Sequence, residues 1–306
     1  MTKKTVAVFF SVCCCTHSIA QDSAVLIGKK IITLTEVVIN NKLNVPAFID
    51  RVKNDTTFYK AFLNLRLLNY SSINDIRMLD KNGRSQAWLL GKTKQVRDSN
   101  CRRMEILEDE SSGDFYTGNH QYNYYTAQMY ASLFFTSGMI CGEDNIVAGR
   151  AFSTAGKSGL EKHKEQLKML FFNPGKKIKG LPFIADKTAI YDDDMADVYD
   201  FSVDMDAYNK TSCYILKQKV KPGKEGNVLV DEMTTWFDDK NFEVVARNYT
   251  LSYDAGVYDF KVQMEVQLTH AGTYLVPALI RYNGNWKVIF KKRERGVFTA
   301  TLFDFK

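Results

Sequence analysis

The last third of the chain alternates between apolar and polar positions, most clearly in the run KVQMEVQL, where even positions from Val262 to Leu268 are apolar. A period of two predicts a strand with one dry face and one wet face. Connections between such runs are too short for helical crossovers, so the strands are expected to be antiparallel neighbours. The seven predicted strands are Cys213–Val220, Val228–Phe237, Phe242–Tyr253, Val257–Thr269, Tyr274–Tyr282, Trp286–Lys291 and Val297–Phe305.

The dipeptide Asn283-Gly284 is the strongest two-residue hairpin signal in the chain. Both residue types tolerate the positive φ that a type I′ turn requires at its two central positions. The pattern therefore predicts a tight turn between the fifth and sixth of these strands.

Upstream, the pattern favours first a strand and then two helices. The run KIITLTEVVIN, from Lys30 to Asn40, is rich in β-branched residues and predicts one strand. Pro46 suits a first helical position, and Asp55 can cap a second helix. Four apolar residues at helical spacing form the predicted packing face: Phe58, Phe62, Leu65 and Leu68.

Strand-like runs between Ile73 and Leu107 are separated by turn signals at residues 81–83 and 98–100. An aromatic-rich segment follows. A helix that ends at Gly138 is predicted from three residues at helical spacing: Tyr125, Met129 and Leu133. A stripe of this kind usually belongs to a core, and a ligand-lining role is the alternative.

These elements predict the α+β class, with one large antiparallel, curved, half-barrel-like sheet packed against a few helices. A helix from Leu160 to Phe172 is expected to join the two upstream helices on the dry face. The length allows one large core or two. We assign residues 21–150 to an N-terminal strand and helix region, which can share one domain with the rest, and residues 151–306 to a helix followed by the antiparallel meander.

Residues 1–20 have the pattern of a cleavable signal peptide. Two lysines precede an apolar run too short to span a bilayer, and residues 18–20 form a small-x-small cleavage site. We therefore expect a periplasmic or secreted protein whose mature chain starts at Gln21. A lipoprotein signal is the less favoured alternative, because Val12 instead of a small residue precedes Cys13.

The net charge and the cysteines limit which partners and which disulfides are expected. The formal net charge of +6 falls to +4 without the two lysines of the signal peptide. A mild positive charge of this size predicts no nucleic-acid partner.

Three of the six cysteines lie in the signal peptide. Among the others, Cys101 with Cys141 is the favoured disulfide because the two flank one segment, and three buried, reduced cysteines, Cys213 included, are the alternative.

The run AFSTAGKSGLEKHK, residues 151–164, fits the pattern of a phosphate-binding loop. Its partner would be the run VLVDE, residues 228–232, but that run lies in the predicted antiparallel meander, whereas phosphate-loop enzymes use a parallel sheet. Ser158 to Glu161 also forms a capping box that can start the following helix. We prefer the interpretation that these residues start a helix, and no bound nucleotide is expected.

Metal and catalytic signatures are weak. The acidic residues Asp192 to Asp194 lack the Gly and distal Glu of a calcium loop, and we expect a solvated loop before a strand with Tyr199 and Phe201 inward. No nucleophile elbow is present. The histidines of the mature chain do not have ligand spacing: His120, His163 and His270. No catalytic residue, metal or cofactor is assigned.

The segment from Cys213 to Tyr253 resembles the middle of Lol-type periplasmic lipoprotein carriers. The resemblance rests on a Tyr-led strand and a strand that ends in Trp-x-Asp, here Tyr214, Trp236 and Asp238, with Pro277 as a late match. It covers about a third of the chain, which is much longer than a carrier. The chain as a whole, including its early run LTEVVI at residues 34–39, also resembles secreted proteins of Bacteroidota. The resemblance implies a half-barrel closed by helices over an apolar cavity.

These observations predict an extracytoplasmic, non-enzymatic binding protein that holds an acyl chain or lipoprotein in an apolar groove. Tyr214, Trp236 and Phe171 are the predicted lining residues, and a plain core role is their alternative. Peripheral association with the outer membrane fits this prediction. The rival functions are an envelope hydrolase that uses paired carboxylates and a structural partner of an outer-membrane complex, marked by an exposed aromatic patch from Phe115 to Tyr130.

Overall fold

The computed structural model describes residues 24–27, 30–33, 36–37, 43–147, 169–177, 187–192, 195, 197–254, 258–288 and 292–306. The predicted signal peptide, the phosphate-loop-like run and most of the predicted helix from Leu160 lie outside these residues. Residues 169–172, at the end of that predicted helix, are helical.

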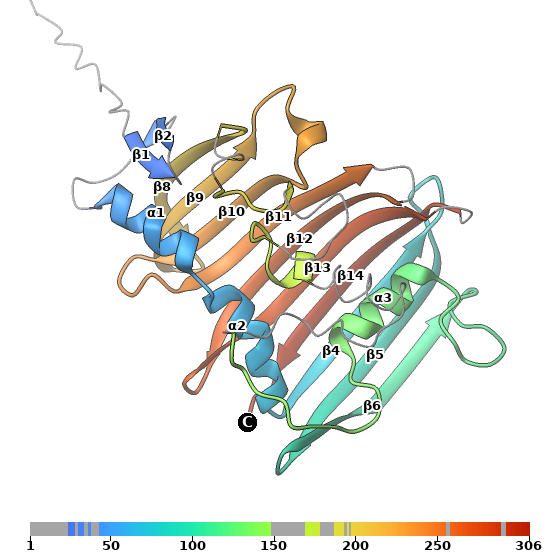
Figure 1. The fold of residues 1–306 in the computed structure, drawn as a ribbon. Helices are drawn as coiled ribbons and strands as arrows, with labels where there is room; N and C mark the ends of the chain where they lie inside the picture. Colours follow the sequence, from blue (N-terminus) through green and yellow to red (C-terminus); the bar gives the residue numbers. More distant parts are fainter. Residues whose placement is uncertain are drawn as a thin grey trace, which may run out of the picture.

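Twelve strands of the described residues form one curved, open sheet (Figure 1). All neighbours are antiparallel except β3 and β8. With helices on one side, this confirms the predicted α+β class and large antiparallel sheet. In spatial order the strands are β3 (Glu36–Val37), β8 (Tyr199–Tyr208), β9 (Thr211–Val220), β10 (Val230–Asp238), β11 (Val244–Asp254), β12 (Tyr258–Ala271), β13 (Tyr274–Val288), β14 (Glu294–Phe303), β4 (Tyr70–Leu79), β5 (Ser85–Asp98), β6 (Cys101–Ser112) and β7 (Ile140–Cys141).

The last strand of the chain joins the two sequence regions. β14 pairs with β4 over a register that runs from Arg295 opposite Leu79 to Phe303 opposite Ser71. Beyond it, the backbones of Asn69 and residue 306 exchange two hydrogen bonds of 2.9 Å. Strands from residues 70–112 and from residues 199–303 therefore belong to one sheet.

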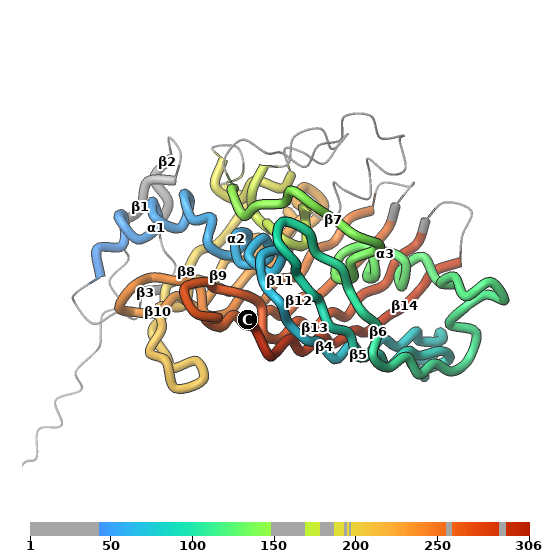
Figure 2. Tube along the Cα trace, turned by 90° about the horizontal axis from the view of Figure 1, so that it is seen from below, coloured from blue at the N-terminus to red at the C-terminus, as the bar shows by residue number. Residues whose placement is uncertain are grey.

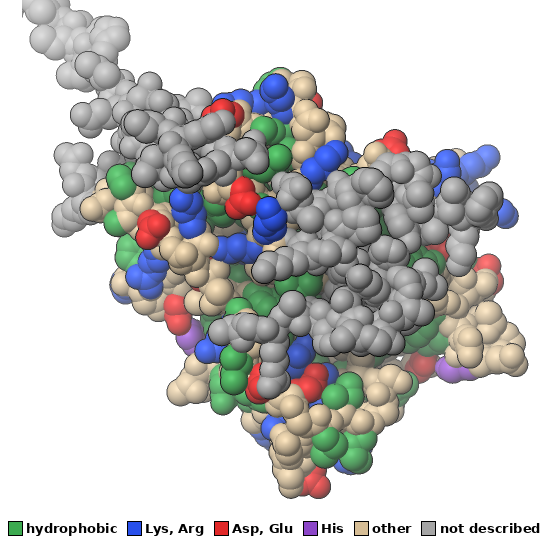
Figure 3. All heavy atoms as spheres, viewed as in Figure 1, with side chains coloured by type: hydrophobic (Ala, Val, Ile, Leu, Met, Phe, Trp, Pro, Cys, Tyr) green, Lys and Arg blue, Asp and Glu red, His purple; other side chains and the backbone are tan. Residues whose placement is uncertain are grey.

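The helices α1 (Val45–Asn54), α2 (Thr57–Asn64) and α3 (Tyr125–Phe134) lie on the same side of this sheet (Figures 1 and 2). On β12, Val262, Met264 and Val266 are buried beneath them, as the alternation predicts. The opposite face carries ion pairs such as Arg281 with Glu265 at 3.2 Å. On the helix side, acidic and basic side chains are interspersed (Figure 3), in line with the mild net charge.

Local sequence explains where α1 and α2 begin. The Asn44 side chain accepts a hydrogen bond from the Ala47 amide and caps α1, whose first turn contains Pro46. The Asp55 carboxylate accepts hydrogen bonds from the amide and hydroxyl of Thr57, so it caps the first turn of α2 as predicted, although the N-cap residue itself is Thr56. The predicted packing face is buried in full: Phe58, Phe62, Leu65 and Leu68.

The predicted helix in the aromatic segment is α3, but its predicted end at Gly138 was wrong. The helix ends at Phe134, and Phe135 is extended while its amide still bonds to the carbonyl of Ala131 at 2.8 Å. Gly138 has a φ of 68° within the turn that follows. The glycine therefore belongs to this later turn, and the helix ends because the backbone becomes extended at Phe135.

The predicted hairpin at Asn283-Gly284 was also wrong, because β13 passes straight through it. Gly284 lies opposite Val262 on one side and Gly296 on the other. A methyl group at Gly284 would overlap the ring of Tyr282, whose hydroxyl accepts a hydrogen bond from the Trp286 indole. The glycine makes room for an aromatic side chain that folds along its own strand, so six strands form where seven were predicted.

The single strand predicted from Lys30 to Asn40 is replaced by two short strands with different partners. β2 (Lys30–Thr33) forms a separate hairpin with β1 (Ala24–Ile27), and β3 pairs with β8 of the large sheet. Both pieces keep the β-branched composition that favours strands. β2 pairs with its neighbour in the chain, whereas β3 pairs with the distant β8, a contact that the local pattern does not contain.

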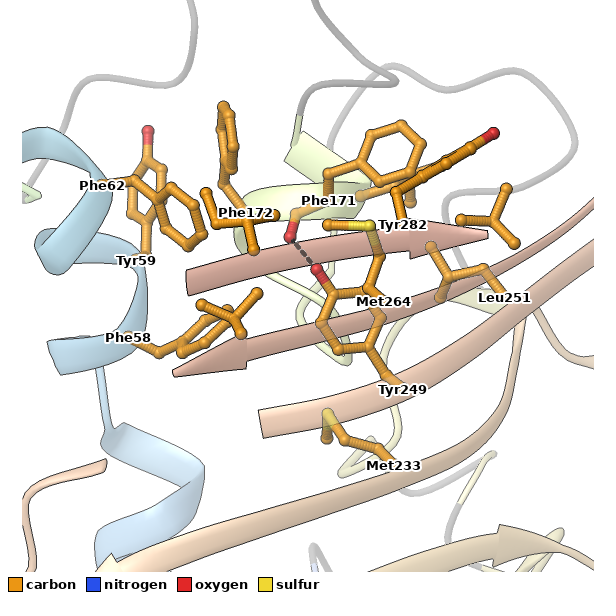
Figure 4. Close-up of a cluster of buried hydrophobic side chains, with 14 of the residues drawn as sticks. Phe58, Tyr59, Phe62, Phe171, Phe172, Met233, Tyr249, Leu251, Met264 and Tyr282 are labelled. Carbon is orange, nitrogen blue, oxygen red and sulfur yellow. Dashed lines mark hydrogen bonds between the residues drawn. The ribbon is translucent and has the colours of Figure 1, made fainter. Parts of the chain in front are cut away.

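Aromatic and apolar side chains from helices and sheet form one core cluster (Figure 4). The Tyr249 hydroxyl donates a hydrogen bond to the carbonyl of Phe171, which ties the helical turn at 169–172 to β11. The rings of Phe62 and Phe172 lie 4.4 Å apart and connect α2 to the same turn. Among the described residues, no helix has the length and apolar character needed to cross a membrane.

Candidate functional site

A cavity of about 550 Å³ lies between the helices and the part of the sheet formed by β14, β4 and β5. This volume is typical of small-molecule sites. Its walls come from α2, α3 and the segment 135–147, and the sheet forms its floor. The lining residues are Tyr59, Phe62, Leu63, Leu65, Arg66, Tyr70, Ser72, Asn74, Gln95, Arg102, Ser132, Leu133, Phe134, Phe135, Thr136, Ile140, Gly142, Glu143, Asp144, Ile146, Phe172, Ala300 and Leu302.

The two helical walls of this cavity are largely apolar, whereas the third wall, the segment 135–147, contains Thr136, Glu143 and Asp144. Phe62 and Leu63 project from α2, and Leu133 and Phe134 come from α3. The ring of Phe172 lies 4.4 Å from that of Phe62 and 5.9 Å from that of Phe134, so it links the two walls. A hydrocarbon chain placed between these helices would lose contact with water on both sides.

The floor is polar, because β4 and β5 place short polar side chains on their covered face. The hydroxyls of Ser72 and Thr93 are 2.7 Å apart, and the Asn74 amide donates to the Ser72 hydroxyl at 3.0 Å. The Tyr130 hydroxyl of α3 donates to Asn74 Oδ1 at 3.2 Å. These bonds satisfy groups that would be costly to bury alone, and they hold α3 over the floor.

Arg102 of β6 is the charged group at the end of this polar floor. Its Nε lies 2.5 Å from Glu143 Oε2, and its Nη2 donates to Oε1 of the same carboxylate at 3.2 Å. Its Nη1 donates to Gln95 Oε1 at 2.9 Å and also to the hydroxyl of Thr136. The side chain is 14% exposed, so the guanidinium is both held and largely removed from solvent. Burial raises the pKa of the neighbouring Tyr70 to about 12, against the opposing charge of Arg102.

A disulfide positions the segment that carries Glu143. Cys101 and Cys141 are joined, which confirms the favoured pairing, and Cys213 is a buried free thiol. The bond holds β7 beside the start of β6, and β7 ends at Cys141, two residues before Glu143. At the far end of the segment, the Asn145 side chain donates to Asn64 Oδ1 at the end of α2 at 2.8 Å. This wall of the cavity is therefore fastened on both sides of Glu143.

The three residues predicted to line a ligand site lie elsewhere, and the structure does not bring them together. Tyr214 is half-buried on the helix side and stacks on Phe242 at 5.6 Å. Trp236 pairs with Ile215 on the opposite face of the sheet. Phe171 is a core residue, and none of the three lines the cavity. A ligand contact for these side chains stays a prediction.

Sequence reasoning did not identify Gln95 and Arg102 as site residues. In the run TKQVRD on β5, polar residues occupy both the odd and the even positions, so the alternation does not show which face of the strand is buried. Gln95 lies on the buried face and is only 1% exposed. The useful signal was the cysteine pairing, since it places Arg102 next to one bonded cysteine and Glu143 two residues after the other.

A second, smaller hollow of about 270 Å³ is lined in part by Lys53, Lys176 and Tyr191. The Lys176 ammonium donates to the carbonyl of Lys53. Burial, helped by the charge of Arg247, lowers the pKa of Lys176 to about 8, although Asp55 acts in the opposite direction. Arg247 and Asp55 form a buried pair with atoms 3.9 Å apart, and both charges are near enough to act on Lys176.

Candidate metal ligands remain apart in the described part of the chain, where no three His, Cys, Asp or Glu side chains gather at binding distance. His270 lies 3.0 Å from Glu243, and His120 lies 3.7 Å from Asp109, both with exposed imidazoles. His163 lies outside the described residues. Tyr199 and Phe201 point inward from β8, as predicted.

No family model matches this chain, and no curated protein matches it. Among solved structures, it is similar to a DUF1329 family protein from Desulfovibrio piger, at 10% identity and a TM-score of 0.26, over 82% of this chain and 93% of that one. It is also similar to an outer membrane lipoprotein-sorting protein domain from Vibrio parahaemolyticus, at 7% identity and a TM-score of 0.26, over 81% of this chain and 91% of that one. Scores of this size mean that the overall superposition is weak.

Proposed function

We propose that this chain is an extracytoplasmic, non-enzymatic binding protein that holds the acyl chain of a lipid or lipoprotein in the cavity between α2, α3 and the sheet. The observation that carries the proposal is a cavity of about 550 Å³ whose two helical walls present aromatic and aliphatic side chains. The N-terminal pattern supports the location outside the cytoplasm. Burial of acyl methylene groups, each contributing about 0.8 kcal/mol, supplies the binding free energy.

The carboxylates of the cavity support a binding site better than a hydrolase. Glu143 is held by Arg102, and Arg66 Nε approaches the same carboxylate at 3.6 Å. A carboxylate that pairs with two guanidiniums serves as a counter-ion. A general acid would instead need an environment that favours its protonated form.

The first test is mass spectrometry of an organic extract from the protein, exported through its own signal and purified without detergent. We expect a stoichiometric amphiphile with an acyl chain. Leu133→Trp, which fills the cavity from α3, should lower its occupancy, whereas Leu90→Trp on the opposite face of the sheet should leave it unchanged. An empty extract, together with no uptake of a hydrophobic dye, would contradict the proposal and favour the enzyme or structural-partner functions.

A further inference from the structure

An ionic group is already bound inside the cavity at the position where the polar floor ends. There, the guanidinium of Arg102 holds the Glu143 carboxylate through two nitrogens, at 2.5 and 3.2 Å. Both side chains line the cavity, with exposed fractions of 14% and 21%. Paired nitrogen contacts of this kind are the geometry by which arginine recognises carboxylates in general. Glu143 therefore occupies a carboxylate-binding position inside the proposed ligand site.

Neighbouring side chains hold the Arg102 guanidinium in the orientation that binds a carboxylate. Gln95 Oε1 and the Thr136 hydroxyl accept hydrogen bonds from Nη1, which fixes the plane of the guanidinium. Gln95 is itself held, because its amide donates to the carbonyls of Leu65 and Leu68 at 2.6 and 2.7 Å. Arg66 adds a second cation 3.6 Å from Glu143, while Asp144 adds an acid to the same wall.

We propose, on the basis of the function proposed above, that the ligand is a single-chain amphiphile with a carboxylate head group, which binds Arg102 in exchange for Glu143. The acyl chain lies between α2 and α3, and the head group reaches the end of the floor at β6. An unpaired guanidinium in this setting would be costly, so Glu143 neutralises it when the cavity holds no carboxylate. One carboxylate replaces another, and the charge of the site does not change.

The test compares lauric acid with methyl laurate by isothermal titration calorimetry on the delipidated full-length mature protein. We expect the acid to bind more tightly than the ester in the wild type, and at least about 30-fold more tightly in Glu143→Gln, where no carboxylate of the chain competes for Arg102; this is the usual minimum effect of one hydrogen-bonded charge pair. Arg102→Gln should bring the ratio of the two affinities close to one. Arg77→Gln provides the matched control, since Arg77 pairs with Asp75 on the opposite face of the sheet.

Glu143→Gln separates exchange from simple attraction, because it removes the competing carboxylate and should tighten the binding of lauric acid. If Arg102→Gln does not fold, the double variant Arg102→Gln/Glu143→Gln keeps the site neutral and should give the same ratio near one. Equal affinities for acid and ester in the wild type would overturn the head-group inference while leaving the acyl cavity in place. Binding of neither compound would overturn the proposed function as well.

Discussion

Gly284 has a different role in the structure from the hairpin turn that its sequence context indicates. It lies inside β13, under the ring of Tyr282, which stacks on Phe298 with ring centroids 4.6 Å apart. Tyr282 is only 5% exposed, so its ring has little freedom to move aside. The glycine is required by this close approach.

We therefore expect Gly284→Ala to lower the free energy of unfolding by about 1–3 kcal/mol, the usual cost of inserting a methyl group into a packed core. Urea denaturation monitored by tryptophan fluorescence would measure it. Gly118→Ala is the control, because nothing lies within 4 Å of the added methyl group there. An equal effect of the two substitutions would refute the packing explanation.

Lys176 predicts a pH dependence of stability. Its pKa is lowered to about 8 in the folded protein from an ordinary value of 10.5. Between these values the unfolded chain binds the proton and the folded chain releases it, so this group makes stability rise with pH from about 8 to 10.5. Lys176→Met should stabilise the protein most at neutral pH, and its advantage should shrink as the pH approaches 10.

The measurement is the difference in unfolding free energy between wild type and Lys176→Met at pH 7, 8, 9 and 10. Taking the difference cancels the contributions of the buried tyrosines, whose raised pKa values act in the opposite direction at high pH. Lys177→Met is the control, since Lys177 is exposed. A difference that is constant across this range would exclude the proposed titration.

At this scale, the sequence predicted a helix cap and a disulfide, but it did not predict the roles of Gly138 and Gly284, which depend on the surrounding structure. Asp55 starts α2, and Cys101 bonds to Cys141, because caps and nearby flanking cysteines are visible in the chain itself. Gln95 and Arg102 could not be predicted, since their burial depends on α3 and the segment 135–147 crossing the covered face of the sheet. The cavity, and with it the candidate site, was therefore expected only as a general groove.

Among the elements, the short strand β7 depends most on a covalent bond. It pairs with β6 through two positions only, Cys101 with Cys141 and Arg102 with Ile140. We expect the double variant Cys101→Ser/Cys141→Ser to lose about 2–4 kcal/mol of stability, because the bond closes a loop of 40 residues. It should also loosen the cavity wall that carries Glu143.

Chemical denaturation measures the stability, and hydrogen exchange of residues 135–147 measures the local effect. Cys213→Ala is a suitable control, since it removes a buried thiol without changing a crosslink. Unchanged exchange in this segment after removal of the bond would show that packing alone holds the wall. The period-two pattern predicted β12 and its neighbours, but it could not show that β7 is so short, because two residues contain no period.

For the whole molecule, the pairing of β14 with β4 makes the two sequence regions one sheet. We expect thermal unfolding in a single transition, with equal calorimetric and van't Hoff enthalpies. Ile76→Ala on β4 and Val262→Ala on β12, both fully buried, should each lower the temperature of that same transition. Two separate transitions, each sensitive to one variant, would show independent domains.

The sequence predicted this molecule's class because short connections require antiparallel neighbours, and that rule needs only local information. It did not predict that β4 and β14 are neighbours. Their contact joins residue 71 to residue 303, and no turn or spacing marks a pair so far apart. The assignment of residues 21–150 to a region that can share one domain with residues 151–306 stays a prediction, which the thermal unfolding experiment tests.

The place of β14 in the sheet also sets an order in time. A ribosome makes β4, β5 and β6 early, and it makes the central strand that joins them to the meander last of all. Until residues 294–303 emerge, both β13 and β4 have an unpaired edge, and the final sheet cannot form. The complete sheet therefore forms only after this strand has left the ribosome, and a late step of this kind would suit the export proposed above.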